Sequence, residues 1–584
     1  MSYGHIAVEG HVTSSSSGTL GARRARWGRS AVAACLSVAL LGCSSEDPGG
    51  RSSPTAPGNG NQDTVQGSKD ATDAQVKPAA VRGRCETSRV GPGLLRRLTR
   101  TELQATIQDV FPEIAADWRG TRLSADPAST LGFSNDSSAL LVGVQTAGEI
   151  LRTAEDVASL VTSEGVLPVV LPCASAGGEA CAGEFVDQYG LRLFRRPLAA
   201  EERGEYLSLF NSVAAESDFA MGIKWTLVAL LQSPHAVYRS ELGTPGDGGR
   251  RELTQHEIAT QLAYMYGGST PDATLLELAA SGRLSDPAVR AEQARRLIRS
   301  PRGLEVVQEF FRSWLGYESI VYAQRDDVPN FSTTIAPDLV EETRRFVSQV
   351  IFEEGGDLRD LLQAPYTMLN ANLANYYGFG HGADTWQRAE RPWGAGLLSQ
   401  GSVLVSTAHE SATSPTLRGL LVYRKLLCND KILPPAIVPT LEQSAGEAQT
   451  TRELFEVAHL TKGAGCDNCH RLFDPPGFTF EHFDETGRYR EQENGHPIDP
   501  SGYLPLADGS RVELANFDDL VAQMDEVPQV SDCVSGLMMA YMFSGGGGQV
   551  CLAEDERAAL ASGEIGIEEY LVRLTQAPHF TTRQ

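Results

Sequence analysis

Basic residues are few in this sequence of 584 residues. Lysine and arginine number 50 against 74 aspartates and glutamates, which gives a formal net charge of −24 at pH 7. An excess of negative charge repels polyanions and therefore argues against nucleic acid or an anionic headgroup as a partner. The sequence also lacks a Gly-x-Ser-x-Gly elbow, a glycine-rich phosphate loop and a His-Glu-x-x-His pair. The hydrolase, nucleotide-binding and zinc-protease classes that these motifs indicate are therefore unsupported.

Long apolar runs are scarce as well. The apolar stretch of residues 30–41 is too short to cross a bilayer as a permanent helix, and four arginines precede it at positions 23, 24, 26 and 29. This pattern predicts an export signal. The stretch ends at Cys43 in a sequence that resembles a bacterial lipobox, so we expect lipidation of Cys43, a membrane anchor, and a location in the periplasm or at the cell surface. Secretion without a lipid is the alternative.

The most informative motif is Cys466-Asp-Asn-Cys469-His470. Thiols at this spacing can each form a thioether to a haem vinyl group, which places the adjacent imidazole beneath the iron as proximal ligand. A structural zinc site would need a second ligand pair at similar spacing, and none follows. A redox dithiol would need a strand before the motif, but residues 461–465 resemble a loop. The motif therefore predicts one covalent haem c.

The sixth iron ligand and the propionate contacts come from residues outside the motif. Met542, with Met538 and Met539 as neighbours, is one candidate ligand, and His459 is the other. We expect Met542 or a nearby residue to close the iron for electron transfer, because no convincing acid–base pair for peroxide cleavage is present. An open iron would favour peroxide or oxygen chemistry. Arg488 and Arg490 are candidate partners of the haem propionates.

Six further cysteines remain in the part of the chain that follows Cys43, an even number that suits an oxidising compartment: Cys85, Cys173, Cys181, Cys428, Cys533 and Cys551. Their spacing favours two local disulfides. We expect Cys173 to pair with Cys181, and Cys533 to pair with Cys551.

Helical signals dominate the rest of the chain. Thr99 with Glu102, and Thr254 with Glu257, have the spacing of capping boxes that start helices. Leucine-rich runs end before a proline at two matching places, Gln-Ser-Pro-His235 and Gln-Ala-Pro-His579, which predicts helix ends there. We expect both histidines to cap or pack rather than to bind a ligand. The fold class is therefore mainly α, built of several small helical modules, with a cytochrome-c-like C-terminal third.

Ordered motifs give the chain a family resemblance. Residues 94–109, 193–198, 253–259, 396–401, 413–419, 466–470, 474–478 and 487–490 resemble, in order and spacing, the modules of planctomycete cytochrome-c-associated proteins of unknown function. The resemblance implies export and a module with C-x-x-C-H, but no particular reaction. The chain departs from it at Tyr541-Met-Phe-Ser-Gly545, where the family usually has Tyr-x-x-Gly-Arg.

Composition and motifs together divide the chain into seven parts. We expect a lipoprotein signal at 1–43, a disordered tether at 44–83, three helical modules at 84–165, 166–245 and 252–385, a haem module at 392–503, and a C-terminal helical module at 510–584.

The expected function is that of an exported, lipid-anchored haem protein with an electron-transfer or oxidoreductase role. Its upstream modules would bind a redox partner protein or a substrate of unknown identity. The alternative is an envelope binding or scaffold protein in which C-x-x-C-H is vestigial or binds another metal.

Overall fold

The computed structural model describes residues 92–380, 382–429, 450–460, 466–545 and 554–584. The chain divides into two units, 1–74 and 75–584, and every described residue belongs to the second. Cys43 and the expected signal and tether lie outside the described residues. Helices dominate and the sheets have two or three short strands, which confirms a mainly α fold of several helical modules. No helix in the described part of the chain is long and apolar enough to span a membrane.

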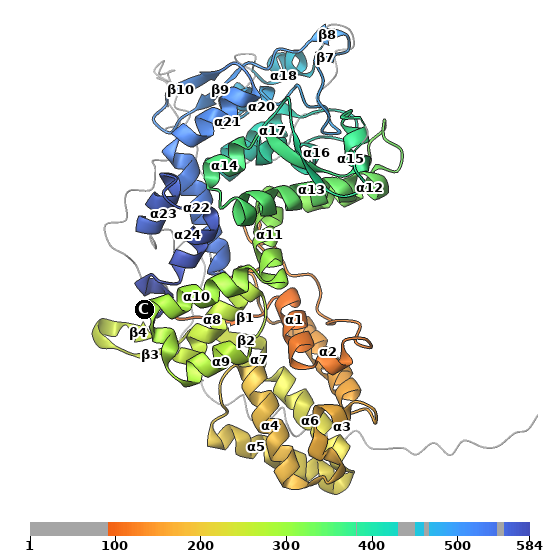
Figure 1. Cartoon of the computed structure of the whole chain (residues 1–584), viewed down its shortest axis with the longest axis vertical. Coiled ribbons are helices and arrows are strands. Elements are labelled where there is room, and N and C mark those ends of the chain that lie inside the picture. Colours follow the sequence, from red (N-terminus) through yellow and green to blue (C-terminus); the bar gives the residue numbers. More distant parts are fainter. Residues whose placement is uncertain (1–91, 381, 430–449, 461–465, 546–553) are drawn as a thin grey trace, which may run out of the picture. The chain divides into compact units, whose positions relative to one another are not determined.

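Two consecutive stretches of the chain, residues 95–348 and 349–583, contain the helices and strands labelled in Figure 1. The first contains β1 (Leu95–Arg97), α1 (Arg100–Val110), α2 (Val144–Val161), α3 (Leu167–Val170), α4 (Gly178–Phe194), α5 (Ala200–Glu216), α6 (Phe219–Gln232), α7 (Pro234–Val237), β2 (Tyr238–Ser240), β3 (Thr244–Pro245), β4 (Arg251–Glu252), α8 (Gln255–Gly267), α9 (Ala273–Ala280), α10 (Pro287–Ile298), α11 (Pro301–Leu315), α12 (Phe331–Thr334) and α13 (Ala336–Ser348).

The second contains the π-helical turn η6 (Gln349–Glu353), α14 (Leu358–Gln363), β5 (Tyr366–Leu369), α15 (Ala371–Tyr376), β6 (Gln387–Glu390), α16 (Gly401–Ser406), α17 (Pro415–Leu420), the π-helical turn η8 (Leu421–Leu426), α18 (Thr451–His459), α19 (Asp467–His470), α20 (Asp474–Phe478), β7 (Gln492–Glu493), β8 (His496–Pro497), β9 (Gly502–Pro505), β10 (Arg511–Leu514), α21 (Phe517–Glu526), α22 (Pro528–Met542), α23 (Glu554–Ala561), α24 (Ile567–Leu574), η9 (Pro578–Phe580) and β11 (Thr582–Arg583).

The predicted helix starts and ends are confirmed. Thr99 and Thr254 each cap a helix, α1 and α8, with a reciprocal bond from the glutamate three residues on. Helix α6 ends at Gln232, one residue before Ser233-Pro234, and α24 ends at Leu574, shortly before Pro578. Since proline holds the residue before it out of the α region, the chain extends after each of these turns.

The strands that precede the capped helices pair with the strands that follow the proline turns. Strand β1, which precedes capped helix α1, pairs antiparallel with β2, which follows the first proline turn. Strand β4, which precedes capped helix α8, pairs in the same way with β11, which follows the second turn. In both cases a strand before a capped helix pairs with a strand after a proline turn. The two pairings enclose segments of the chain that differ greatly in length.

A buried ionic cluster lies where these short sheets end. Glu241 contacts Arg96 at 2.6 Å and Arg583 at 2.7 Å, and Ser544 accepts hydrogen bonds from Arg96 and Arg239. Ser544 adopts a φ of 48°, in the left-handed region that favours glycine. It stands where the resembling family has glycine in Tyr-x-x-Gly-Arg.

Two large apolar cores support the fold. One is formed by residues of α1, α2, α4 and α6, and it includes Phe111, Phe185 and Leu227. The other runs through α8, α10, α11, α22 and α24 and extends to Phe480 and Phe483, which follow α20. The family-like segments thus pack into shared cores rather than into separate ones.

Helices α17 and α20 approach each other closely beside the C-x-x-C-H motif. A Cβ placed on Gly419 would lie 1.5 Å from the carbonyl oxygen of Phe473, and one on Gly477 would lie 1.9 Å from that of Pro415. Only glycine allows this approach. The buried guanidinium of Arg418 then donates to three backbone carbonyls and contacts Glu481 at 3.2 Å, which holds the segment after α20 against α17.

The disulfides confirm one expected pair and correct the other. Cys173 is bonded to Cys181, eight residues away. Cys533 is bonded to Cys428 across 105 residues, so the expected partner Cys551 was wrong. The end of η8 packs against α22 and brings Cys428 to Cys533, a contact that proximity in sequence does not reveal. Cys85 and Cys551 lie outside the described residues.

Candidate functional site

The site is built from three short helices around the C-x-x-C-H motif. Helix α18 begins with a capping box between Thr450 and Glu453 and ends at His459. Helix α19 contains Cys469 and His470, and α20 begins at Asp474 with two prolines in its first turn. Since proline fits the first turn of a helix, where its missing N–H is not needed, Asp474 is held at a defined helix start.

Asp474 lies at the centre of the site, with a fully buried side chain. Its Oδ2 accepts from Nδ1 of His470 at 2.9 Å and from Nδ1 of His459 at 3.0 Å, and its Oδ1 accepts from Thr416 Oγ1 at 2.7 Å. Burial by itself would raise the pKa of Asp474, but these hydrogen bonds outweigh it and hold the pKa below its ordinary value. The carboxylate is therefore ionised at neutral pH.

His470 is oriented by this contact. With Nδ1–H directed to Asp474, its Nε2 carries the lone pair that a metal would bind. A carboxylate behind a ligating histidine fixes both its tautomer and its ring orientation. The ring also packs on Phe473, with centroids 4.9 Å apart.

Cys466 and Cys469 are half-buried thiols with no disulfide between them. The compact group of ligand atoms in the described residues comprises His459, His470 and Asp474, all within 4.8 Å of one another, and neither cysteine sulfur belongs to it. A tetrahedral zinc ion would draw its four ligand atoms to within roughly 4 Å of each other, so the thiols do not complete a Cys2His2 site in this arrangement. A haem uses its thiols at the edge of the ring and its histidine at the centre, and the residues fit that division.

His459 lies beside His470, not opposite it. The two rings are in contact, tilted by 37° with centroids 3.8 Å apart. Two imidazoles on opposite faces of one iron would have centroids roughly 6 Å apart, since each metal–nitrogen bond is about 2 Å long. In this arrangement His459 would lie on the same side of a haem iron as the proximal ligand His470. To serve as the sixth ligand, His459 would have to move to the opposite side.

Met542 is not brought to His470. It is the last residue of α22, and its neighbours Phe543 and Ser544 contact His579, Arg96 and Arg239. Met542 itself is buried in the large core, as are Met538 and Met539. The start of α22 is joined to the C-x-x-C-H module through Cys533. Met542 follows nine positions later, which corresponds to about 13 Å of helix. Met542 as the sixth ligand therefore stays a prediction, and it would require this buried side chain to leave the large core.

Arg488 and Arg490 have protein partners. Arg490 contacts Glu481 and Glu493, each at 3.3 Å. Arg488 donates to Thr486 and lies 3.4 Å from Asp484. Binding to haem propionates stays a prediction for both, and it would compete with these contacts.

The histidines beside the two proline turns are packing residues, as expected. The ring of His235 packs against that of Phe194 in a tilted arrangement and contacts Glu202 at 3.3 Å, with its side chain half exposed. His579 is buried against Phe543, and burial lowers its pKa to about 4.

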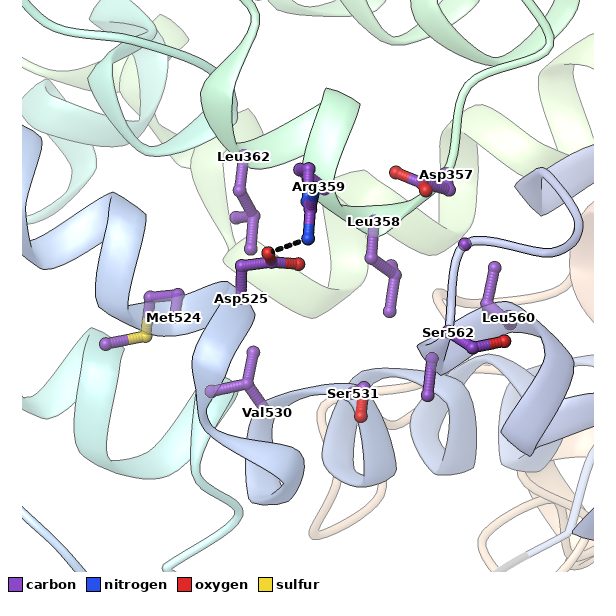
Figure 2. A pocket seen from close by; sticks show the side chains of 12 residues that line it. Asp357, Leu358, Arg359, Leu362, Met524, Asp525, Val530, Ser531, Leu560 and Ser562 are labelled. Carbon is purple, nitrogen blue, oxygen red and sulfur yellow. Dashed lines mark ion pairs between the residues drawn. The ribbon is translucent and has the colours of Figure 1, made fainter.

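The described part of the C-terminal half contains an open groove and a smaller cavity. An open groove of about 530 Å³ runs between α18, α20 and the β9–β10 hairpin, next to the site but without either histidine in its wall. Figure 2 shows the other, of about 180 Å³, where Arg359 of α14 forms an ion pair with Asp525 of α21. This second cavity is too small for a haem and contains no residue of the C-x-x-C-H motif.

Asp474 is not among the site residues expected from the sequence, yet its carboxylate is buried and joins both histidines. The spacing of His470 and Asp474, i and i+4, was an available signal, since such residues lie on one face of a helical turn.

Four segments of the chain match family models. Residues 96–163 match PSD3 (DUF1587), 181–241 match PSD5 (DUF1595), 253–379 match PSD4 (DUF1592), and 394–493 match PSCyt3 (DUF1588), each described as a protein of unknown function. Four segments are thus PSD or PSCyt modules. The PSCyt3 match covers α16 to β7 and contains every residue of the site. No curated protein and no solved structure matches the chain.

Proposed function

We propose that the PSCyt3 segment binds one haem c covalently and that the protein has a redox role. Cys466 and Cys469 would hold the haem through thioethers, and His470 would be the proximal ligand through Nε2. The bound haem would supply one-electron chemistry at its iron. The observation that carries the proposal is the buried Asp474 carboxylate on Nδ1 of His470, because it leaves Nε2 to bind iron in a motif whose two cysteines are not joined to each other.

Covalent attachment is the direct test. The protein is produced with a c-type maturation system, boiled in detergent, separated on a gel and stained for haem. We expect a stained band for the native chain and none for the Cys466→Ala/Cys469→Ala variant. The matched control is Cys173→Ala/Cys181→Ala, which removes two cysteines far from the site and should keep the stain. An unstained native chain would end the proposal.

Two redox roles remain under this proposal. In the described residues neither Met542 nor His459 lies opposite His470, which favours an iron able to accept an exogenous ligand. We therefore expect a high-spin ferric spectrum and ready binding of cyanide. A low-spin spectrum and slow displacement would instead favour closed, electron-transfer ligation, the expectation from the sequence.

A second candidate function follows from the compact group His459, His470 and Asp474. Two histidines and one carboxylate are also the ligands of mononuclear non-haem iron sites. In this case metal content, measured by mass spectrometry on the purified chain, would survive Cys466→Ala/Cys469→Ala and be lost in His459→Ala. We favour haem because both Nδ1–Oδ2 distances are those of hydrogen bonds to a carboxylate, and because this alternative leaves the cysteines unused.

We also propose that Cys43 carries a lipid that anchors the protein to a membrane, outside the cytoplasm, where it would meet a redox partner. The support is the basic and apolar sequence that ends at Cys43. Cys43→Ser should move the protein from the membrane fraction to the soluble fraction. Cys35→Ser, within the apolar stretch, is the matched control and should stay with the membrane. Continued membrane association of the Cys43 variant would exclude lipidation as the anchor.

A further inference from the structure

We propose that Asp474 is the positioning residue that sets how strongly His470 donates to a haem iron, and that His459 moderates this effect through the same carboxylate oxygen. The inference rests on the proposed function, since it requires His470 Nε2 to be an iron ligand. Neither Asp474 nor His459 is part of the C-x-x-C-H motif.

Three donors share the two oxygens of Asp474. His470 and His459 both donate to Oδ2, at 2.9 and 3.0 Å, and Thr416 donates to Oδ1 at 2.7 Å. The carboxylate has no solvent-exposed surface. Because water does not reach it, the balance among these three hydrogen bonds determines how much negative charge faces His470.

That charge acts on the iron through the imidazole. A carboxylate accepting from Nδ1–H makes the imidazole more basic than a neutral acceptor does. A more basic axial ligand stabilises ferric over ferrous iron, so the reduction potential falls. A second donor to the same oxygen withdraws charge from it, so His459 acts against Asp474.

The two residues should therefore shift the potential in opposite directions. Asp474→Asn keeps the shape but removes the charge, and the potential should rise. His459→Phe keeps a ring on the face of His470 but removes the competing donor, and the potential should fall. Thr416→Val, an almost isosteric change, removes the donor to the more distant oxygen and should lower the potential by less. Mere loosening of the site would shift all three variants in the same direction.

The experiment is a spectroelectrochemical titration of the purified haem-loaded chain at one fixed pH, with the ferric absorption spectrum recorded alongside. We expect Asp474→Asn to change the ferric-to-ferrous ratio at a given potential at least tenfold, which is 59 mV for one electron. The matched control is Asp467→Asn in α19, which removes the same charge from the helix of His470 without touching its Nδ1. Its shift should be less than half as large.

Each outcome decides something. A native chain without covalent haem overturns the proposed function. Attached haem with equal shifts in Asp474→Asn and Asp467→Asn, or with Asp474→Asn and His459→Phe shifting the same way, overturns this inference alone. If Asp474→Asn does not load haem, His459→Phe and Thr416→Val carry the test. Both must then lower the potential, and an unchanged or raised potential in either refutes the role.

Discussion

Arg583, close to the C-terminal end of the sequence, forms a 2.7 Å ion pair with Glu241, and both side chains are buried, 3% and 5% exposed. The pair joins β11 to the residue after β2, and Arg96 of β1 contacts the same carboxylate. Glu241 thus connects the β1–β2 strand pair to the β4–β11 strand pair. Charges this deep must be paired, since an isolated buried ion loses its hydration without compensation.

Removing Arg583 should destabilise the protein strongly. We expect Arg583→Met to lower the free energy of unfolding by about 3 kcal/mol, because the buried Gln261 side chain and the carbonyl oxygens of His579 and Thr582 lose the hydrogen bonds that Arg583 donates, in addition to its ion pair with Glu241. Urea denaturation followed by circular dichroism measures this. The control is Arg295→Met, which breaks the half-exposed pair with Glu569 and should cost less than about 1 kcal/mol. An equal loss of unfolding free energy in the two variants would contradict a special contribution of the buried cluster to stability.

His579 should make stability depend on pH. Burial lowers its pKa to about 4 from an ordinary 6.5, so protonation is harder in the folded than in the unfolded chain. Its contribution is complete above pH 6.5 and is lost as pH falls toward 4, at up to about 1.4 kcal/mol per pH unit. His579→Phe should remove this slope from urea denaturation curves measured over that range.

His235 is the internal control for the same prediction, because it follows the matching proline turn but is half exposed. Solvent weakens its effect, so His235→Phe should leave most of the slope in place. If both variants flatten the curve equally, burial of His579 is not the cause.

The glycines between α17 and α20 should tolerate no side chain. Gly477→Ala would place a Cβ 1.9 Å from the Pro415 carbonyl oxygen, and we expect the free energy of unfolding to fall by about 3 kcal/mol as the helices separate. Gly204→Ala in α5 is the control. No atom lies within 4 Å of its Cβ position, so better helix propensity should raise stability by about 1 kcal/mol. If the denaturation midpoints of both variants moved in the same direction, the predicted clash at Gly477 would be refuted.

The two disulfides should differ in their effect. In the chain-entropy account, the Cys428–Cys533 bond closes a loop of 105 residues and contributes about 5 kcal/mol, while Cys173–Cys181 closes eight and contributes about 2.5 kcal/mol. The test replaces both cysteines of one disulfide at a time, with serine or with alanine, and compares the urea midpoints of the variants. It shows which disulfide contributes more to stability. A larger loss from the short loop would show that native packing, and not chain entropy, dominates.

Local signals in the sequence were sufficient for much of the fold. The capping boxes at Thr99 and Thr254, the proline turns before His235 and His579, and the Cys173–Cys181 bond each involve residues a few positions apart. Their geometry follows from backbone and side-chain chemistry within one turn, so no distant residue is needed. The C-x-x-C-H motif is of the same kind, since it places its thiols and imidazole by spacing alone.

Tertiary packing decided what surrounds those local features. The Cys428–Cys533 disulfide, the Glu241–Arg583 ion pair and the pairing of β1 with β2 all join residues far apart in the sequence. They form because helices far apart in the sequence bury their apolar faces together. The same holds at the site, where the approach of α18 to α20 brings His459 to Asp474. The sequence by itself determined which residues supply the thiols and imidazoles of the proposed site. Burial in the folded chain determined which neighbours they have, because a carboxylate becomes a strong acceptor for two histidines only where water is excluded.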